Sequence, residues 1–270
     1  MNLKGKYAVI TGASSGIGKE FSHQLAKKGM NLIICARREH LLESLAQQLR
    51  EQYQVQVEVL KVDLGSTNAS NEILQKIKQM NIEVQFLLNN AGTGLYGPFD
   101  QYPIEKHNQV IQLNVMSVVN LTYHFTKHMK AHGKPSHIVN IASIAAYLSL
   151  PNFAIYNASK AFVKRFTQGL ALELRGTNIS VNCICPGVTQ TEFFDAANQE
   201  MNAFGKISIM PVEKMVRISL RSVLRHKITK VVGLSNQLMI TLFKLLPESL
   251  VSKAANSIFS KGVKIKNIPG

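Results

Sequence analysis

Short apolar runs alternate with longer amphipathic segments along most of the chain. The apolar runs contain few polar positions, as expected for strands that helices cover on both faces. We expect such strands at residues 6–10, 32–36, 55–62, 86–89, 137–141, 179–185 and 228–232. The segments between them have the apolar spacing of helices and predict them at residues 17–28, 41–52, 71–80, about 103–130, 156–174 and 212–225. This alternation predicts an α/β fold, a doubly wound parallel sheet of seven strands with helices on both faces.

The composition indicates one domain. The chain has 270 residues, 46% of them hydrophobic, and no linker, low-complexity run or repeat divides it. The first six residues lack a long apolar run and a predicted strand follows at once, so we expect no signal peptide and a cytoplasmic protein. The cysteines lie inside apolar strands and are expected to be buried, reduced thiols, with no metal site: Cys35, Cys183 and Cys185.

Positive charge is concentrated near the C-terminus. The net charge is +15, and residues 206–270 hold twelve Lys and Arg against two acids. A basic stretch can face nucleic acid, an anionic membrane surface or an anionic substrate. We expect no nucleic-acid partner, because the stretch contains no zinc-finger or aromatic-rich RNA-binding signature.

Three histidines, His124, His128 and His132, recur at four-residue intervals on the long predicted helix. This spacing places their imidazoles on one helix face. We expect no metal there, since acids and cysteines are absent nearby and such histidines are more often solvated or at a subunit contact.

A glycine-rich loop, Thr-Gly-Ala-Ser-Ser-Gly-Ile-Gly at residues 11–18, joins the first predicted strand to the first predicted helix. Glycine lets the backbone turn tightly and approach a pyrophosphate, and the helix N-terminus offers free N–H groups. A strand before the loop and a helix after it predict a single-domain Rossmann fold that binds a dinucleotide. The expected contacts from this loop are Gly12, Ser14, Ser15, Gly16, Ile17 and Gly18.

Two arginines, Arg37 and Arg38, follow the second predicted strand, and no acid occurs before Glu39. In NAD-binding proteins an acid at this place holds the adenosine ribose. A guanidinium suits a 2′-phosphate instead, through paired charge-assisted hydrogen bonds. The arginines therefore predict NADP(H) as the cofactor.

Tyr156 and Lys160 are four residues apart in a predicted helix, with Ser143 thirteen residues before the tyrosine. The spacing alone favours a half-buried aromatic beside a solvated lysine. A neighbouring ammonium would favour the phenolate and lower the pKa of the tyrosine from about 10. Together with the glycine loop, the pair predicts a site of proton transfer.

In their order and spacing these motifs resemble the short-chain dehydrogenase/reductase family over about residues 1–192. The sequence 63–64 resembles that family's adenine contact, 89–92 its loop beside the cofactor, and 186–188 with Thr191 its nicotinamide-side loop. Asn114 is at the position of its mid-helix asparagine. By resemblance the cofactor contacts also include Asp63, Leu64, Asn90, Ala91, Gly92, Tyr156, Lys160, Pro186, Gly187, Val188 and Thr191.

The resemblance implies an NADP(H)-dependent oxidoreductase that interconverts a carbonyl and an alcohol by hydride transfer. Ser143 would hold the substrate oxygen and Tyr156 would transfer its proton. Lys160 would bond the nicotinamide ribose and lower the tyrosine pKa, and Asn114 would support a proton relay. A 3-oxoacyl thioester reductase and a catalytically silent NADP-binding sensor or scaffold are the alternatives. Helix pairing in that family implies a homodimer or homotetramer.

The C-terminal part is expected to define the substrate. We divide the chain into a catalytic domain, 1–233, with a substrate lid at about 190–211, and a basic amphipathic helical extension, 234–270. The lid is rich in large apolar residues, which suits a small lipophilic substrate but also a segment packed on the core. The first run of the extension is shorter than the roughly 20 residues that span a bilayer. It could contact a membrane surface, cover the active site or join subunits.

Overall fold

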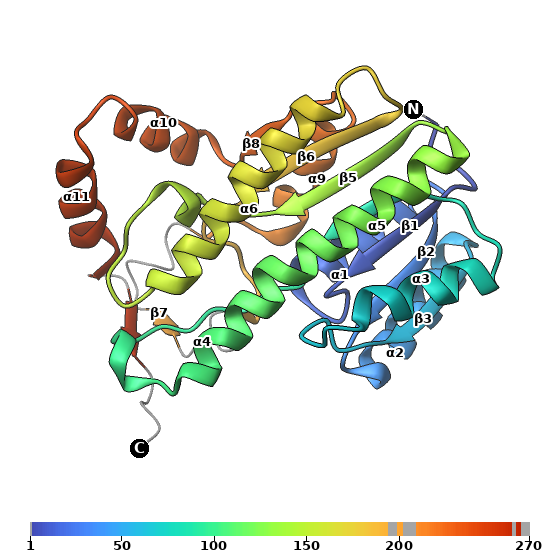
Figure 1. Cartoon of the computed structure of the whole chain (residues 1–270), viewed down its shortest axis with the longest axis horizontal. Coiled ribbons are helices and arrows are strands. Elements are labelled where there is room, and N and C mark those ends of the chain that lie inside the picture. Colours follow the sequence, from blue (N-terminus) through green and yellow to red (C-terminus); the bar gives the residue numbers. More distant parts are fainter. Residues whose placement is uncertain (1, 194–198, 202–208, 261–262, 266–270) are drawn as a thin grey trace.

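The chain folds around a seven-stranded sheet (Figure 1). The computed structural model describes residues 2–193, 199–201, 209–260 and 263–265. Every pairing in this sheet is parallel. In sheet order the strands are β3 (Val57–Lys61), β2 (Asn31–Ala36), β1 (Tyr7–Thr11), β4 (Val84–Asn89), β5 (Ser136–Ile141), β6 (Ile179–Cys185) and β8 (Thr229–Val231). The predicted α/β fold with a seven-stranded, doubly wound sheet is confirmed.

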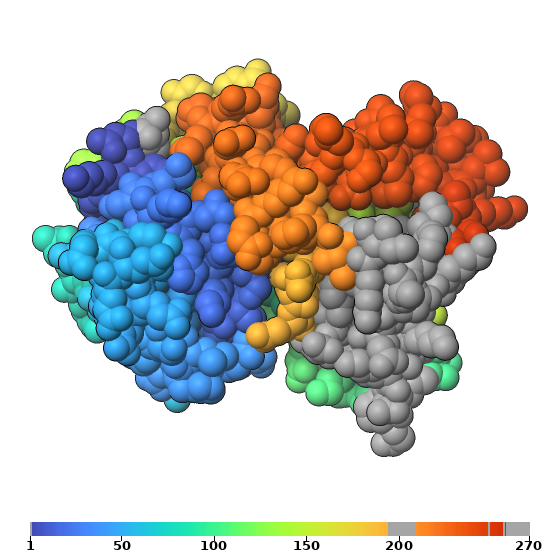
Figure 2. All heavy atoms as spheres, turned by 180° about the vertical axis from the view of Figure 1, so that it is seen from behind, coloured from blue at the N-terminus to red at the C-terminus, as the bar shows by residue number. Residues whose placement is uncertain are grey.

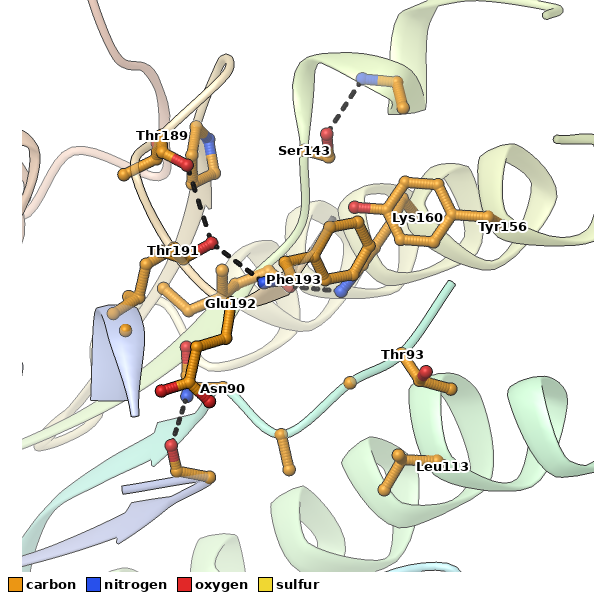
Figure 3. A pocket seen from close by; sticks show the side chains of 18 of the residues that line it. Asn90, Thr93, Leu113, Ser143, Tyr156, Lys160, Thr189, Thr191, Glu192 and Phe193 are labelled. Carbon is orange, nitrogen blue, oxygen red and sulfur yellow. Dashed lines mark hydrogen bonds between the residues drawn. The ribbon is translucent and has the colours of Figure 1, made fainter. Parts of the chain in front are cut away.

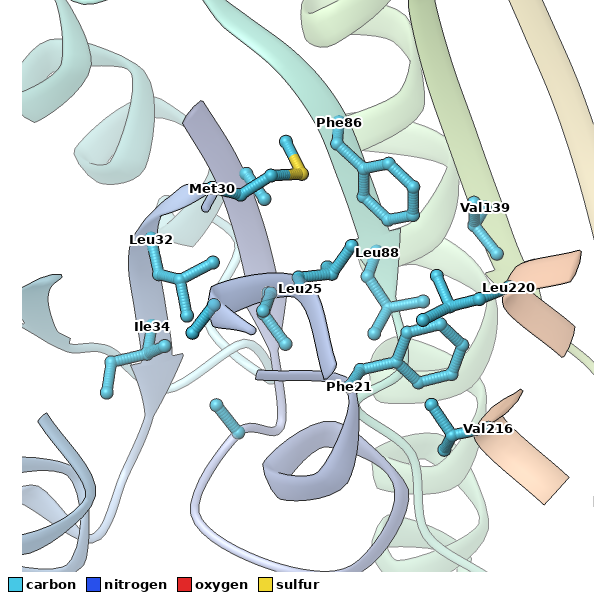
Figure 4. Packing of buried hydrophobic residues seen from close by; sticks show 14 of the residues in the cluster. Phe21, Leu25, Met30, Leu32, Ile34, Phe86, Leu88, Val139, Val216 and Leu220 are labelled. Atoms are coloured by element: carbon cyan, nitrogen blue, oxygen red, sulfur yellow. The ribbon is translucent and has the colours of Figure 1, made fainter. Parts of the chain in front are cut away.

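Helices cover both faces of the sheet. One face carries α1 (Gly16–Ala26), α2 (Glu39–Tyr53) and α9 (Val212–Val223). The other carries α3 (Ala69–Gln79), α4 (Ile104–Ile111), α5 (Ser117–His132) and α6 (Ala154–Glu173). On the first face Phe21 of α1 and Leu220 of α9 pack against strand residues such as Phe86 (Figure 4). Burial of a side chain of this size stabilises the fold by roughly 1.5–3 kcal/mol.

The strand order reverses between β1 and β4. From β1 the chain builds the sheet through β2 to β3, and from β4 it builds in the other direction through β5 and β6. The connections after β1 and β4 therefore leave the sheet on opposite faces, and a crevice opens at the carboxyl ends of the two strands. This is where the glycine loop and the 89–92 loop meet.

The helix predicted at 103–130 is not uniform. Between α4 and α5 the chain forms a π-helical segment, η2 (Gln112–Met116), that contains Asn114. The side chain of Asn114 bonds both backbone groups of Thr93, with N–O distances of 2.9 and 2.8 Å. A π turn leaves no mark in the apolar pattern, so the sequence predicted a regular helix here. Such turns occur frequently at functional sites.

The cysteines and histidines have structural contacts. All three cysteines are buried, free thiols, as predicted. His128 Nε2 accepts a hydrogen bond from the Val84 N–H at 2.9 Å, and His132 Nε2 lies 3.1 Å from the Val84 carbonyl oxygen. These two imidazoles thus hold the start of β4. In the described ranges no three His, Cys, Asp or Glu side chains are grouped as a metal site requires.

The C-terminal extension packs against the catalytic part of the chain. It contains α10 (Leu234–Phe243) and α11 (Glu248–Ser260), which form a lobe beside α9 in Figure 2. Beyond α11, β9 (Val263–Ile265) pairs antiparallel with β7 (Gln199–Met201), a pairing that the sequence did not predict. No helix in the described part of the chain has the length and apolar character needed to cross a membrane.

Candidate active site

The crevice at the strand ends is a cleft of about 520 Å³ (Figure 3). Most of the residues predicted to form the site line it together: Gly12, Ser14, Ser15, Gly16, Ile17, Arg37, Arg38, Asp63, Leu64, Asn90, Ala91, Gly92, Ser143, Tyr156, Lys160, Pro186, Gly187, Val188 and Thr191. Two predicted residues, Gly18 and Asn114, lie behind its wall. Seven stretches that are separated in the sequence therefore meet in one place.

The glycine loop has the backbone that a pyrophosphate requires. Gly12 and Gly16 have φ of +64° and +51°, in the left-handed region that favours glycine. A Cβ on Gly18 would lie 2.2 Å from the Gly12 carbonyl oxygen, so only glycine lets the start of α1 pack against the loop. No side chain caps the N-terminus of α1, and no acid lies in its first turn. Its free N–H groups and positive dipole end therefore fit an anionic group.

Thr11 and Asn90 join the loops after β1 and β4. The Thr11 hydroxyl donates to the Leu88 carbonyl oxygen at 3.0 Å and accepts from the Asn90 N–H at 2.9 Å. The Asn90 side chain donates in return to the backbone oxygens of Thr11 and Gly12. Thr11 was not among the predicted site residues, although it begins the glycine motif. These bonds fix the floor of the cleft.

Arg38 bridges two edges of the cleft. Its guanidinium lies 3.2 Å from the Ser14 hydroxyl and 3.1 Å from a carboxylate oxygen of Glu192. Arg37 is exposed beside it. The carboxylate of Asp63 accepts a hydrogen bond from the Gly65 N–H at 3.0 Å, which shapes the turn after β3. Arg37 and Arg38 thus line the cleft at the end of β2. Glu192, which pairs with Arg38, was not predicted from the sequence.

Ser143, Tyr156 and Lys160 lie together at the inner end of the cleft. Ser143 follows β5, and its hydroxyl accepts a hydrogen bond from the Ala145 N–H at 3.1 Å. Tyr156 and Lys160 are one turn apart on α6, with the lysine Nζ 5.7 Å from the centre of the tyrosine ring. Lys160 Nζ also donates to the Ile141 carbonyl oxygen at 3.1 Å. The two side chains are 8% and 5% exposed, so water has little access to either.

Burial dominates the titration of this pair. It raises the pKa of Tyr156 to about 12, while the hydrogen bond with Ser143 acts in the opposite direction. It lowers the pKa of Lys160 to about 8, against the effect of the nearby Cys183 and Cys185 thiols. The sequence predicted that Lys160 would lower the tyrosine pKa. In the structure the net shift of the tyrosine pKa is upward, because desolvation disfavours the charged forms of both side chains.

Asn114 lies directly behind the 89–92 loop. Besides its two bonds to Thr93, its amide donates to the Ser159 hydroxyl at 3.1 Å. A Cβ on Gly92 would lie 3.1 Å from Asn114 Oδ1 and 3.3 Å from Lys160 Nζ. The absence of a side chain at position 92 therefore allows Asn114 and Lys160 to pack directly against the 89–92 loop.

Aromatic rings pack around Tyr156. The Phe153 ring stacks on it with centroids 4.3 Å apart, and Phe193 lies 5.3 Å away. Tyr96 meets Phe153 edge to face at 5.6 Å. The sequence had pointed to Phe193 through its apolar lid, but residues 194–198 and 202–208 of that lid lie outside the described residues. Phe153 and Tyr96 come from loops that have no periodic pattern to identify them.

The extension supports this apolar wall. Leu148, which lines the cleft, packs in one cluster with Ile240 of α10 and Val251 of α11. The Asn236 side chain of α10 lies against Gly187, where a Cβ would be 2.2 Å from its Nδ2 atom. The first two helices of the extension therefore pack behind the substrate side of the cleft.

Comparison with known proteins agrees with this geometry. The sequence matches the short chain dehydrogenase family over residues 6–202. It is 32% identical to the 7beta-hydroxysteroid dehydrogenase of Mediterraneibacter gnavus over 187 residues, 69% of this chain and 70% of that protein. A short-chain dehydrogenase from Sphingobium yanoikuyae in complex with NADPH superposes with a TM-score of 0.79 and 30% identity, covering 85% of this chain and 88% of that one. A structure of a 7beta-hydroxysteroid dehydrogenase gives a TM-score of 0.85 at 26% identity, covering 94% of this chain and 99% of the other. The chain therefore belongs to the short-chain dehydrogenase family of oxidoreductases.

Proposed function

We propose that this enzyme uses NADP(H) to interconvert a carbonyl and an alcohol on a small lipophilic substrate. One observation carries the proposal: Ser143 and the buried side chains of Tyr156 and Lys160 line the same cleft as the glycine loop. A proton-transfer group and a nucleotide-binding loop are thereby placed in a single cavity. Positioning two reactants side by side in such a cavity is a major source of rate enhancement.

The residues present fit an NADP dinucleotide. The loop at 12–18 would hold the pyrophosphate, and Asp63 and Leu64 the adenine. Arg37 and Arg38 would bind the 2′-phosphate, since guanidinium groups bind phosphate through paired, charge-assisted hydrogen bonds. The 90–92 loop, the 186–188 segment and Thr191 line the remaining length of the cleft. When bound, the nicotinamide would supply or accept the hydride.

The residues of the chain would manage the proton. Ser143 would hold the substrate oxygen by a hydrogen bond beside the Tyr156 hydroxyl. Tyr156 would donate a proton to that oxygen in reduction and remove it in oxidation, a contribution of about 10²–10⁴ in rate. Lys160 would bond the nicotinamide ribose, and its charge would then favour the phenolate. Asn114 would position the 92–93 backbone that contacts Lys160 and supports a proton relay.

The apolar surroundings of Tyr156 support a lipophilic substrate. Phe153, Phe193 and Leu148 present hydrocarbon surface next to the phenol and offer few polar partners. An apolar pocket with a few fixed polar groups is typical of sites for lipophilic small molecules. The similar 7beta-hydroxysteroid dehydrogenases are named for a steroid substrate, which agrees with this substrate class.

A cofactor-oxidation screen tests the proposal. Purified enzyme is given NADPH or NADH with long-chain aldehydes, ketosteroids and a 3-oxoacyl thioester, and cofactor absorbance is followed. We expect turnover with NADPH on at least one lipophilic ketone or aldehyde, and its loss in Tyr156→Phe with NADPH binding retained. Tyr123→Phe, on an exposed tyrosine of α5, is the matched control. Ordinary turnover by Tyr156→Phe would rule the assignment out.

The same screen separates the alternatives. Preference for the thioester would favour a 3-oxoacyl reductase. Tight NADPH binding without turnover on any compound would favour a silent sensor or scaffold.

We also propose that the enzyme is a homodimer or homotetramer. Tyr123 of α5 and Phe162 and Leu172 of α6 are large apolar side chains exposed on neighbouring helices of one face. Such side chains are typical of an interface between copies. Phe162→Glu should shift the mass measured by light scattering to that of a smaller assembly, whereas an unchanged mass would exclude this face.

A further inference from the structure

A second cleft, of about 590 Å³, lies between α6, α9, β8 and α10. We call it the basic groove, because five cationic side chains line it and no acid does: Arg221, Arg225, Lys227, Lys230 and Lys244. In the described part of the chain none of the five forms an ion pair with a carboxylate. Five unneutralised positive charges around one hollow favour an anionic ligand.

One residue that lines the same groove, Ser222, has a buried hydroxyl without a partner. Ser222 lines the groove together with its neighbour Arg221 and with Arg225, and it is only 7% exposed. Its Oγ atom has no hydrogen-bond partner in the structure. Buried hydroxyls in proteins are nearly always hydrogen-bonded, so a group that occupies the groove would supply the missing partner. A phosphate oxygen accepts from a hydroxyl and from guanidinium and ammonium groups alike.

The groove is partly preorganised. The Gln168 side chain of α6 donates to the Thr229 hydroxyl of β8 at 3.0 Å across its base. Lys244 Nζ lies 5.5 Å from the centre of the Tyr147 ring, and Lys164 Nζ lies 3.6 Å from it. The tyrosine ring thus keeps two ammonium groups near one wall. An anion would meet cations that are already gathered.

A row of exposed leucines runs beside the groove on α10. Gln237, Thr241 and Lys244 line the groove. Each is followed by a leucine: Leu238 and Leu242 lie about 100° further round the helix, and Leu245 lies in the turn that follows it. These leucines are exposed by 62%, 52% and 78%, and Leu234 extends the row. An apolar row of this kind, bordered by cations, is unusual on a soluble surface and marks a contact site.

We propose that α10 and the basic groove form one docking surface for an anionic phospholipid membrane. The groove would bind the phosphate of a lipid headgroup, with Ser222 and the two arginines as its partners, and the leucine row would enter the boundary of the acyl chains. An interfacial helix combines apolar and cationic groups in this way. The charge of the groove decides between a lipid surface and a second copy of this basic chain, since two copies would bring like charges together.

The position of the surface suits the proposed substrate. Tyr147 lines the groove, and the next residue, Leu148, lines the catalytic cleft. Docking would therefore bring the apolar wall of the cleft close to the lipid. The docking proposal does not depend on this link and can be tested without a substrate.

The test is sedimentation of full-length protein with vesicles. One set contains phosphatidylcholine alone and the other equal parts of phosphatidylcholine and phosphatidylglycerol. We expect binding to the anionic set, weakened roughly thirtyfold in Arg221→Gln/Arg225→Gln. Leu238→Gln/Leu242→Gln should lose binding to the anionic set. The control Lys27→Gln/Lys28→Gln removes the same charge from exposed positions at the end of α1 and should bind like the wild type.

A single-atom variant separates a ligand contact from a structural role. Because the Ser222 hydroxyl has no protein partner, Ser222→Ala should leave the unfolding midpoint unchanged. It should still weaken binding to anionic vesicles by roughly two- to tenfold, as expected for a lost hydrogen bond. Ser222→Ala that binds like the wild type would remove the hydroxyl from the site.

Three results would overturn the proposal. The first is absence of binding to anionic vesicles by the wild type. The second is inorganic phosphate that stabilises the wild type, but not Arg221→Gln/Arg225→Gln, while vesicles fail to bind, because the groove would then serve a soluble phosphate. The third is a smaller assembly in Leu238→Gln/Leu242→Gln, because the leucine row would then join subunits.

Discussion

The ring of Phe153 lies almost parallel to that of Tyr156, with centroids 4.3 Å apart and planes 19° apart. The stacked Phe153 ring is part of the proposed apolar wall of the substrate site. It also excludes water from the Tyr156 phenol. Burial in turn is the largest cause of the raised tyrosine pKa. Phe153 thus belongs both to the proposed substrate wall and to the surroundings that raise the pKa of Tyr156.

Phe153→Ala should lower the pKa of Tyr156 from about 12 toward its ordinary 10.0, because water reaches the phenol. Alcohol oxidation needs the phenolate, so its rate rises as pH rises through this pKa. The rising limb of kcat/KM for oxidation should therefore move to lower pH. Phe99→Ala, at an exposed phenylalanine outside the cleft, should leave the limb in place. An unmoved limb in Phe153→Ala would show that this ring does not control the titration.

Arg37→Gln/Arg38→Gln should weaken NADPH binding at least tenfold and leave NADH binding almost unchanged. The reason is that hydrogen bonds to a charged group contribute about 1.5–3 kcal/mol each, and only NADPH has the 2′-phosphate. Fold stability should change little, since the Arg38–Glu192 pair is exposed and such pairs contribute about 0–1 kcal/mol. Fluorescence titration with both cofactors measures the effect. Equal weakening for both cofactors would contradict the NADP assignment.

Glu192→Gln supplies the complementary measurement. It removes the carboxylate that holds Arg38 and keeps the size of the side chain. NADPH should then bind as tightly as in the wild type or more tightly. The reason is that the Arg38 guanidinium no longer has to leave the Glu192 carboxylate in order to bind the 2′-phosphate. Weaker binding would mean that Glu192 positions the arginine instead of competing for it.

Asn114→Ala should destabilise the fold by about 1–3 kcal/mol. The substitution leaves the N–H and carbonyl oxygen of Thr93 without their partners, both of which the asparagine side chain supplies. Urea unfolding measures the change, with Asn71→Ala at an exposed position of α3 as the control. Loss of turnover without loss of stability would instead assign Asn114 to the proton path alone.

Because His137 is buried, we expect the folded protein to lose stability in acid. Burial lowers its pKa from the ordinary 6.5 to about 4, although Asn182 opposes the shift through a hydrogen bond. Between these values the unfolded chain binds a proton that the folded chain does not. Stability should therefore be fully present above pH 6.5 and fall by about 3 kcal/mol as the pH drops toward 4. His137→Asn should flatten this part of the urea-unfolding profile, and an equal slope in both proteins would contradict the assignment.

The sequence predicted those parts of the site that a single segment encodes. The loop at 11–18 and the Tyr156–Lys160 turn carry their conformation in neighbouring residues, so their chemistry was readable before the fold. Glu192 was not, because its contact with Arg38 joins residues 154 positions apart. The groove cations likewise come from α9, the turn after it, β8 and the end of α10, and they form a cluster only after folding. The sequence predicted a lowered pKa for Tyr156, whereas burial raises it. This difference has the same origin, since burial is a property of the folded chain.

The pairing of β7 with β9 joins residues 199–201 to residues 263–265 by backbone hydrogen bonds. A truncation that removes the extension would therefore also take away the backbone partner of Gln199–Met201. A loss of activity in a shortened protein could then arise from the altered 199–201 segment as well as from the missing extension. Genetic dissection of this enzyme consequently calls for point substitutions on α10 in place of deletions.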